Sequence, residues 1–392
     1  MSATSPPPSP ADGRRMELQV PRRSRWEEFW RLFRRNRLAV GGMIIFILFF
    51  GVATAGLFLT AGTQPIFDPA LVRLQEKLRP PLARPHVDSL GAQEVPPLGV
   101  YLLGTDELGR DVFARMLQGA WVSLTVGFVA VGIAVFIGIF MGGMAGYFGQ
   151  EFIRIGHLLW AVAVIAGAAL LFSGIVAVGL LVGAGGVAGL VHNLTPKRIS
   201  GRTQRSWGGA VLAQNAMRVD TLIMRFVDIM LCFPSFFLIL TVVALLPPSI
   251  YNIMIVIGLT SWMGAARFVR AEFLALREQD FVAAARALGL GNFRIIFRHM
   301  MPNAIAPVLV SATIGIATAI LTEAGLSFLG FGVPPPHATW GNILSDGRQF
   351  IFDAPWLTFI PGLAILIVVL AFNLFGDGLR DVLNPKLRER HA

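Results

Sequence analysis

The chain of 392 residues is 55% hydrophobic and only 14% charged, and its mean hydropathy is +0.66. Soluble domains carry about 25% charged residues, so this composition excludes an ordinary water-soluble fold. The net charge of +10 does not indicate nucleic-acid binding, because the basic residues lie beside the apolar runs rather than on one soluble face.

The N-terminal region, residues 1–37, is predicted to be cytoplasmic. Residues 1–21 contain Pro, Ser and Arg without an apolar core, which predicts a disordered tail rather than a signal peptide. In residues 22–37, RRSRWEEFWRLFRRNR, aromatic residues recur at helical spacing among arginines. That pattern is typical of a helix lying at the membrane interface, and a plain cytoplasmic flank fits equally well.

Long stretches without charge predict membrane-spanning helices. A hydrocarbon core of about 30 Å requires about 20 helical residues, and several stretches are longer. We predict an all-α integral membrane protein with six core spans, the first at 38–61 and the others within a transmembrane domain at 119–376. The spans after the first are expected at 119–146, 220–246, 250–270, 303–328 and 356–376.

Two further segments complete the predicted organisation. Residues 62–118 are rich in proline and form an external region too small for an independent enzyme. Residues 158–191 are uncharged, and one straight helix of that length would reach about 51 Å, which overshoots a bilayer. We therefore predict a hydrophobic hairpin of two short spans, or a re-entrant pair, within an inserted segment at about 151–218.

The basic residues orient this predicted topology of eight crossings. Seven of the 33 Lys and Arg residues fall outside the cell, which leaves 26 on the cytoplasmic side, as the positive-inside rule requires. We therefore expect a multi-pass protein of the bacterial cytoplasmic membrane with both termini, including the tail at 377–392, in the cytoplasm.

The loop at 272–302 lies between two predicted spans. Asp280 is expected to cap a helix, and Gly289 to end it in a left-handed conformation. One face of this helix carries Phe281, Ala284, Ala285 and Leu288. Asn292 is expected to cap a second short helix before Pro302 opens the next span. Two short amphipathic helices are typical of a knob that docks into another protein, although a loop that packs on its own bundle has the same periodicity.

The order of small residues in this loop has a family parallel. The run Ala283-Ala284-Ala285, then Gly289, then Pro302 thirteen residues later, resembles the EAA loop of binding-protein-dependent ABC importer permeases. Ala283 stands where that motif often has glutamate. Two longer segments, LGTDELGRDVFARMLQGAWVSL (103–124) and EAGLSFLGFGVPPPHATWGNIL (323–344), resemble the dipeptide/oligopeptide permeases of the same group.

The resemblance implies a type I ABC importer permease bundle that moves di- or oligopeptides, with an ATPase-coupling loop at Asp280 to Pro302. It also implies a second homologous permease subunit, two ATP-binding subunits, an extracytoplasmic solute-binding protein and membrane lipid as partners. In that family GYFG (146–149) leads almost directly into VDTLIMRFVDIMLCFPSF (219–236), whereas about 70 residues intervene here. The hairpin is therefore an insertion relative to the usual pattern, and its role is open.

Charges within or beside the spans are the remaining candidates. Arg225 and Asp228, three apart, are expected to pair on one helix, and Arg267 and Arg270 to reach the inner surface. Glu323 is a candidate for the translocation path, because an intramembrane carboxylate is costly; an outer-interface position or a hydrogen bond to a neighbouring helix explains it equally.

Missing motifs narrow the function. None of the three lysines follows a glycine, so the chain lacks a phosphate-binding loop and ATP hydrolysis is expected from a partner subunit. No metal-ligand or nucleophile motif is seen, so we expect a non-catalytic subunit without cofactor or metal. The same machinery importing nickel chelates, glutathione or another small solute is an alternative, as is a stand-alone secondary transporter, which predicts an internal repeat.

Overall fold

The computed structural model describes residues 25–62, 65–87, 90–91, 94–154, 159, 163–164, 166, 180–188 and 215–383. This part of the chain is built almost entirely from helices. They are α2 (Arg25–Arg35), α3 (Arg37–Thr60), η1 (Leu74–Glu76), α4 (Val112–Tyr147), α8 (Val219–Leu231), α9 (Ser235–Leu245), α10 (Ile250–Arg277), α11 (Asp280–Ala287), α12 (Asn292–Arg294), η3 (Ile295–Met300), α13 (Met301–Phe328), α14 (Trp340–Gly347), η4 (Arg348–Phe350) and α15 (Trp356–Leu383).

The described helices include five that are long and apolar enough to cross a membrane: α3, α4, α10, α15 and the continuous stretch Asn292–Phe328. The remaining predicted span, 220–246, is wrong as a single straight helix, because α8 and α9 meet at 79°. Pro234 follows the end of α8, and a proline has no amide hydrogen to continue the helical ladder. With this bent pair counted as one span, the described part has up to six, in agreement with the predicted core.

A short two-stranded sheet marks the two ends of the predicted insertion. Strand β1 (Phe152–Arg154) pairs antiparallel with β2 (Asn215–Arg218), so residues 61 to 66 positions apart lie side by side immediately before α8. Residues 180–188 are helical. Most of the predicted hairpin at 158–191 lies outside the described residues, and its two crossings stay a prediction.

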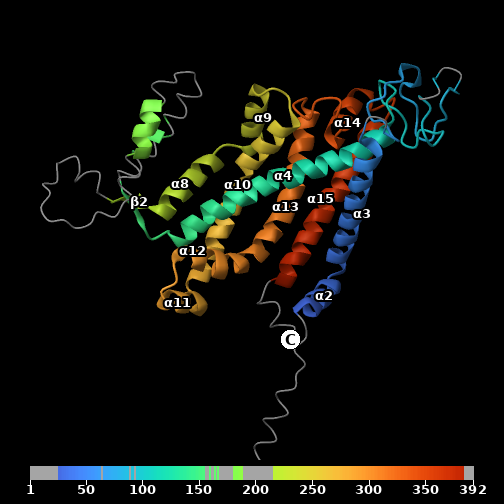
Figure 1. Ribbon diagram of the computed structural model, residues 1–392. Coiled ribbons are helices and arrows are strands. Elements are labelled where there is room, and N and C mark those ends of the chain that lie inside the picture. Colours follow the sequence, from blue (N-terminus) through green and yellow to red (C-terminus); the bar gives the residue numbers. More distant parts are fainter. Residues whose placement is uncertain are drawn as a thin grey trace, which may run out of the picture.

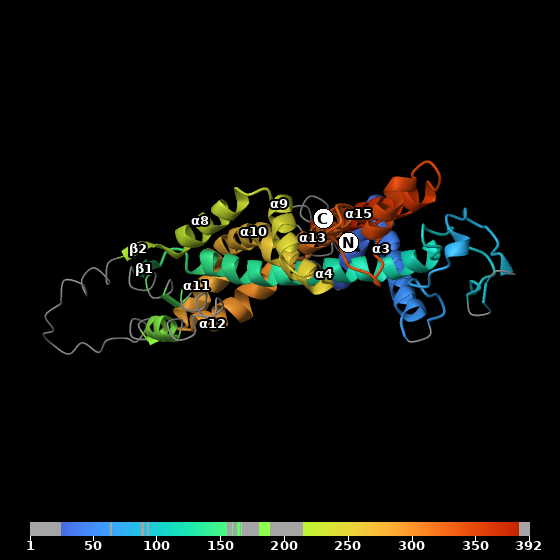
Figure 2. The ribbon, with the colours of Figure 1, turned by 90° about the horizontal axis from the view of Figure 1, so that it is seen from above.

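Helix α4 is the axis of the bundle. Its 36 residues extend for about 54 Å, and α10 packs along it (Figures 1 and 2). Gly138, Gly142 and Gly146 recur every four residues on the face of α4 that meets α10, where a side chain would collide with α10. Small residues at this spacing bring two helix backbones close together.

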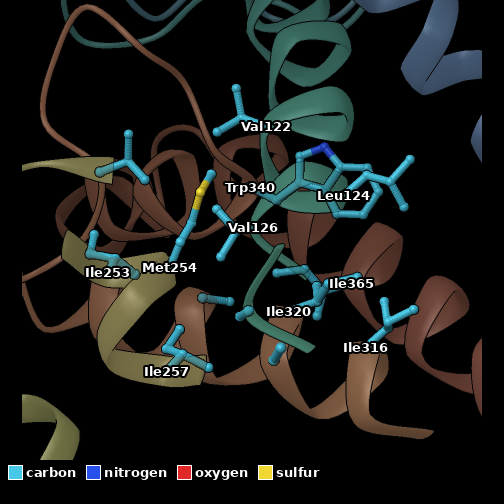
Figure 3. Close-up of a cluster of buried hydrophobic side chains, with 14 of the residues drawn as sticks. Val122, Leu124, Val126, Ile253, Met254, Ile257, Ile316, Ile320, Trp340 and Ile365 are labelled. Atoms are coloured by element: carbon cyan, nitrogen blue, oxygen red, sulfur yellow. The ribbon is translucent and has the colours of Figure 1, made fainter. Parts of the chain in front are cut away.

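The main hydrophobic core lies where α4, α10, α13 and α15 converge (Figure 3). Val126 of α4, Ile257 of α10 and Ile320 of α13 are almost completely buried there. Trp340, the first residue of α14, covers the cluster, and its indole Nε1 donates a hydrogen bond to the carbonyl of Met116 at 3.0 Å. The core therefore fixes α14 against the first turns of α4.

The two ends of the bundle differ in structure (Figure 1). At one end lie α2, α11 and α12, and we call this the α11 end. At the other end lie α14 and the residues that join α3 to α4, and we call this the α14 end. Helix α2 packs on the C-terminal part of α15, where Phe33 is buried and its ring meets that of Phe375 at 6.0 Å. The aromatic face of α2 is thus partly used for packing within the chain.

Residues 65–111 form a proline-rich subdomain at the α14 end. Its backbone is held by two isolated bridges, Ala83 with Tyr101 and Thr105 with Asp111. Tyr101 is fully buried, and burial raises the pKa of its phenol to about 12. The helix that follows begins at Val112, before the predicted start of the span at residue 119, because Asp111 accepts a hydrogen bond from the amide of Phe113 and caps it.

Candidate functional site

Residues 280–300 lie at the α11 end of the bundle, and we call them the α11 knob (Figure 1). Helix α11 ends at Ala287, and Gly289 follows in the left-handed conformation with a φ of +72°. The amide of Gly289 donates to the carbonyl of Arg286 at 2.9 Å, and that of Leu290 to Ala285 at 3.2 Å. These two bonds form a Schellman motif, so the predicted left-handed end at Gly289 is confirmed.

The predicted caps of the knob are wrong. Asp280 is the first residue of α11 and Gln279 its N-cap, without a capping hydrogen bond from the side chain. Asp280 instead places a negative charge in the first turn, where the helix dipole favours it. Gly291 occupies the second cap position, and Asn292 Oδ1 accepts a hydrogen bond from the hydroxyl of Tyr147 at 2.8 Å. Asn292 therefore ties the knob to the end of α4.

One face of α11 is anchored to the bundle. Val282 and Ala285 are buried in a cluster that includes Phe273 of α10 and Ile295. The guanidinium of Arg286 lies 5.4 Å from the ring centroid of Tyr147, a cation–π contact. Because these contacts come from α4, α10 and the next helix, a force on α11 is transmitted to three elements of the bundle.

The opposite face of the knob is apolar and exposed. Phe281 is 40% exposed, Leu288 79%, Phe293 75% and Phe297 52%. Ala284 is also exposed, whereas Ala285 is buried, so the predicted single face divides between the two sides. We call Phe281, Leu288, Phe293 and Phe297 the docking face. Exposed apolar side chains that are clustered at one end of a bundle are typical of a surface covered by a partner.

The second short helix predicted for this loop is part of a continuous span. Residues 292–328 form one helical stretch, with the π-helix η3 between α12 and α13. Ile295 and Met300, five residues apart, are both buried, as the wider π-helical turn allows. Pro302 lies in the first turn of α13, as predicted, although α12, η3 and α13 follow one another without a break.

A groove of 570 Å³ lies between α9, α13, α14 and α15, on the half of the bundle toward the α14 end. Most of its lining side chains are apolar, and Thr318 and Thr322 each bond to a carbonyl of their own helix. The lining residues are Phe236, Thr318, Leu321, Thr322, Ala324, Gly325, Phe328, Leu344, Gly362 and Ile365. An apolar groove along four helices provides a surface for a solute or for another helix.

Glu323 lies beside this groove but does not line it. The side chain is fully buried, and its Oε1 accepts a hydrogen bond from Ser327 Oγ at 2.6 Å. Ser327 Oγ lies 3.5 Å from Thr339 Oγ1, at the N-cap of α14. Glu323 thus connects α13 to α14 through two hydroxyl groups. A direct contact between Glu323 and a transported solute stays a prediction.

The two longer motifs of the sequence analysis meet in space at the α14 end. Asp106 Oδ2 accepts hydrogen bonds from Arg110 Nε at 2.7 Å and Arg115 Nη1 at 2.6 Å. Both arginines also reach Asp346, just beyond the second motif, at 3.2 and 2.9 Å. Arg115 is 3% exposed and Asp106 fully buried. Sequence reasoning missed this network, because nothing local reveals contacts between residues more than 200 positions apart.

The predicted pairing of Arg225 with Asp228 is wrong. Asp228 Oδ1 accepts a hydrogen bond from Arg267 Nη2 at 2.6 Å, and Asp220 binds Arg270. Both ion pairs join α8 to α10, and the predicted position of Arg267 and Arg270 at the inner membrane surface stays a prediction. Among the described residues, no group of three or more His, Cys, Asp or Glu side chains is placed to hold a metal ion.

A bundle of apolar helices with an apolar groove and an exposed docking face defines a polytopic membrane protein of the transport-permease class. Residues 206–389 match the family described as the inner membrane component of binding-protein-dependent transport systems. Residues 24–81 match the N-terminal transmembrane domain of oligopeptide transport permease C. The chain belongs to this family of ABC importer permeases, and membership implies ATP-binding partners and a substrate-binding protein.

Several curated relatives match over nearly their whole length. The dipeptide transport permease DppC of Alkalihalophilus pseudofirmus is 35% identical over 98% of this chain and 95% of its own. The di/tripeptide permease DppC of Pseudomonas aeruginosa is 33% identical over 92% of each chain, and OppC of Bacillus subtilis is 31% identical over 93% of this chain and 91% of its own. A chain of the inward-facing methionine transporter MetNI is a remote likeness, with a TM-score of 0.39 and 18% identity over 69% of this chain and 97% of that chain.

Proposed function

We propose that this chain is the permease subunit through which an ATP-driven importer moves di- and oligopeptides across the bacterial cytoplasmic membrane. The observation that carries the proposal is the 35% identity, over 98% of the chain, to a permease named for dipeptide transport. Relatives named for di/tripeptides and oligopeptides support a peptide backbone, rather than one side chain, as the common feature of the cargo.

The α11 end faces the cytoplasm, and both chain termini lie on that side. Support comes from the basic residues at this end. Arg31, Arg34 and Arg35 lie in α2, and Arg37 is the first residue of α3. Lys and Arg are enriched in cytoplasmic segments of membrane proteins. The proline-rich subdomain and α14 then face outward, where a solute-binding protein delivers cargo.

The complete importer contains a second homologous permease, two ATP-binding subunits and the solute-binding protein. The docking face of the α11 knob inserts into an ATP-binding subunit, and closure of the ATPase pair pushes α11. That push reaches the spans through Val282, Ala285 and the Tyr147–Asn292 hydrogen bond. This chain needs no cofactor of its own and is non-catalytic, because its role is to convert the movement of α11 into a change in the side of the membrane to which the path opens.

The cargo passes along the groove beside Glu323, between this chain and the second permease. An apolar lining with few fixed polar groups suits a path that accepts different side chains, because no single side chain is selected. Glu323 supports the path by holding α13 against α14 and contributes a solute contact only if α14 moves away.

The experiment is co-purification of the tagged chain from detergent-solubilised membranes, with identification of the bound subunits and an ATPase assay. Leu288→Asp places a charge on the docking face without disturbing the core, since Leu288 is 79% exposed, and it is expected to release the ATP-binding subunits. Phe352→Asp is the matched control: Phe352 is 96% exposed at the α14 end, and its variant is expected to retain them. Retention of ATP-binding subunits by both variants would contradict the proposed docking.

A further inference from the structure

A charged pocket of 450 Å³ lies between α8 and α10 and shares no lining residue with the apolar groove. Seven residues line it, and five of them are charged: Asp220, Arg225 and Asp228 from α8, and Arg267 and Arg270 from α10. Three arginines against two aspartates leave the pocket with a formal charge of +1. It lies on the first half of the span that breaks between α8 and α9.

The two ion pairs of the pocket differ in how completely they are satisfied. Arg270 binds both carboxylate oxygens of Asp220, through Nε and Nη2, so this pair is closed. Arg267 binds Asp228 through Nη2 and Oδ1 alone. The remaining guanidinium hydrogens of Arg267 and the second oxygen of Asp228 are left for another group. The Asp228–Arg267 pair is therefore open, and it is half exposed at 51% and 50%.

Arg225 supplies a second unused cation. It is exposed, lines the pocket, and makes no hydrogen bond or ion pair with any described residue. A free guanidinium on an otherwise apolar stretch of helix is costly against hydrocarbon, as is a half-exposed ion pair. The open side of the pocket is accordingly filled by water or by a polar ligand rather than by lipid tails.

We propose that this pocket binds the terminal carboxylate of the transported peptide, held by Arg225 and the free hydrogens of Arg267. Guanidinium groups match carboxylates in geometry and charge, and the net charge of +1 complements a single anionic group. Asp228, through its free oxygen, accepts an ammonium group when a short zwitterionic cargo presents one. The inference rests on the proposed function and adds the part of the cargo that the permease itself recognises.

The test measures uptake by the complete importer in proteoliposomes, with alanyl-alanine and its C-terminal amide as probes. Arg225→Gln is expected to lower kcat/KM for the free acid by about fivefold and for the amide by less than about twofold, the effect of one charge-assisted hydrogen bond in a half-exposed site. The ratio of free-acid uptake to amide uptake is compared between the wild-type and the Arg225→Gln importer. Any preference of the solute-binding protein cancels in this comparison, because both importers receive cargo from the same solute-binding protein. Arg225→Lys keeps the charge and is expected to restore most of the free-acid uptake.

Arg380→Gln is the matched control, since Arg380 is an exposed arginine of α15 outside the pocket, and it is expected to leave both probes unchanged. If Arg225→Gln lowers the uptake of acid and amide equally, or lowers neither, the carboxylate site is overturned. Uptake by the wild-type importer would still support the proposed function in that case. A defect that appears only in vesicles containing phosphatidylglycerol, and equally for both probes, assigns the pocket to a lipid phosphate instead and also overturns it. Import of neither probe by the wild-type complex refutes the proposed function itself.

Discussion

Gly289 offers the sharpest test of how the α11 knob is built. Its φ of +72° is strained for any residue with a Cβ, and Gly289→Ala is expected to cost about 1–2 kcal/mol, which lowers the population of the capped conformation about 5- to 30-fold. Asn visits this conformation more readily, so Gly289→Asn is expected to cost less. No atom lies within 4 Å of the position of a Cβ at Gly289, so backbone strain and not collision causes the loss.

Amide hydrogen exchange of residues 289 and 290 measures this opening directly, because both amides bond to carbonyls of α11. Exchange in Gly289→Ala is expected to be faster by the same factor, and transport by the importer to fall with it. Gly291→Ala is the control: Gly291 has a φ of −65° and equally open space. Equal exchange in the two alanine variants would refute the argument that the left-handed Gly289 holds the knob in shape.

Three further predictions concern the α14 end. Arg115→Leu removes a buried partner of Asp106, and the melting temperature of the purified chain is expected to fall by the equivalent of about 3–5 kcal/mol; an unchanged melting temperature would show that the network is dispensable. Glu323→Gln keeps an oxygen that accepts the hydrogen bond from Ser327, whereas Glu323→Leu leaves the Ser327 hydroxyl without this acceptor. Only the leucine variant is therefore expected to lower the melting temperature. Equal melting temperatures of the two variants would contradict this. Burial raises the phenol pKa of Tyr101 to about 12, so the proline-rich subdomain is expected to lose stability as pH rises from 10 to 12. In an ultraviolet titration, Tyr101→Phe is expected to remove the transition near pH 12. Ionisation of the Tyr101 phenol near pH 10 would argue against its burial.

Apolar spans follow directly from the sequence, because hydropathy over about 20 residues is a local property. Five described helices confirm this, with ends that differ from the predicted ones by up to 11 residues, since the helix predicted from residue 303 begins at Asn292. Helix α10 continues to Arg277 rather than residue 270, because a helix does not stop where the hydrocarbon ends. The bend at Pro234 was readable from the missing amide hydrogen, but its angle of 79° depends on how α9 packs against α10.

The candidate site was predicted less completely. Gly289 is identified by a local preference, since few other residues tolerate a positive φ. Ala284 and Ala285 differ in burial because one residue of helix turns the side chain by about 100°, and a periodicity of small residues does not say which side faces the bundle. Asp228 pairs with Arg267 on another helix instead of with Arg225 on its own, a choice that only the relative position of α8 and α10 decides.

The measurement that tests the central claim most directly is ATP-dependent uptake of a labelled dipeptide by the reconstituted complex of this chain, its partner permease, the ATP-binding subunits and the solute-binding protein. We expect uptake that requires ATP and this chain, and that is abolished by Leu288→Asp on the docking face. Dipeptide uptake that continues without ATP, or without the ATP-binding subunits, would contradict the importer account and favour a stand-alone secondary transporter.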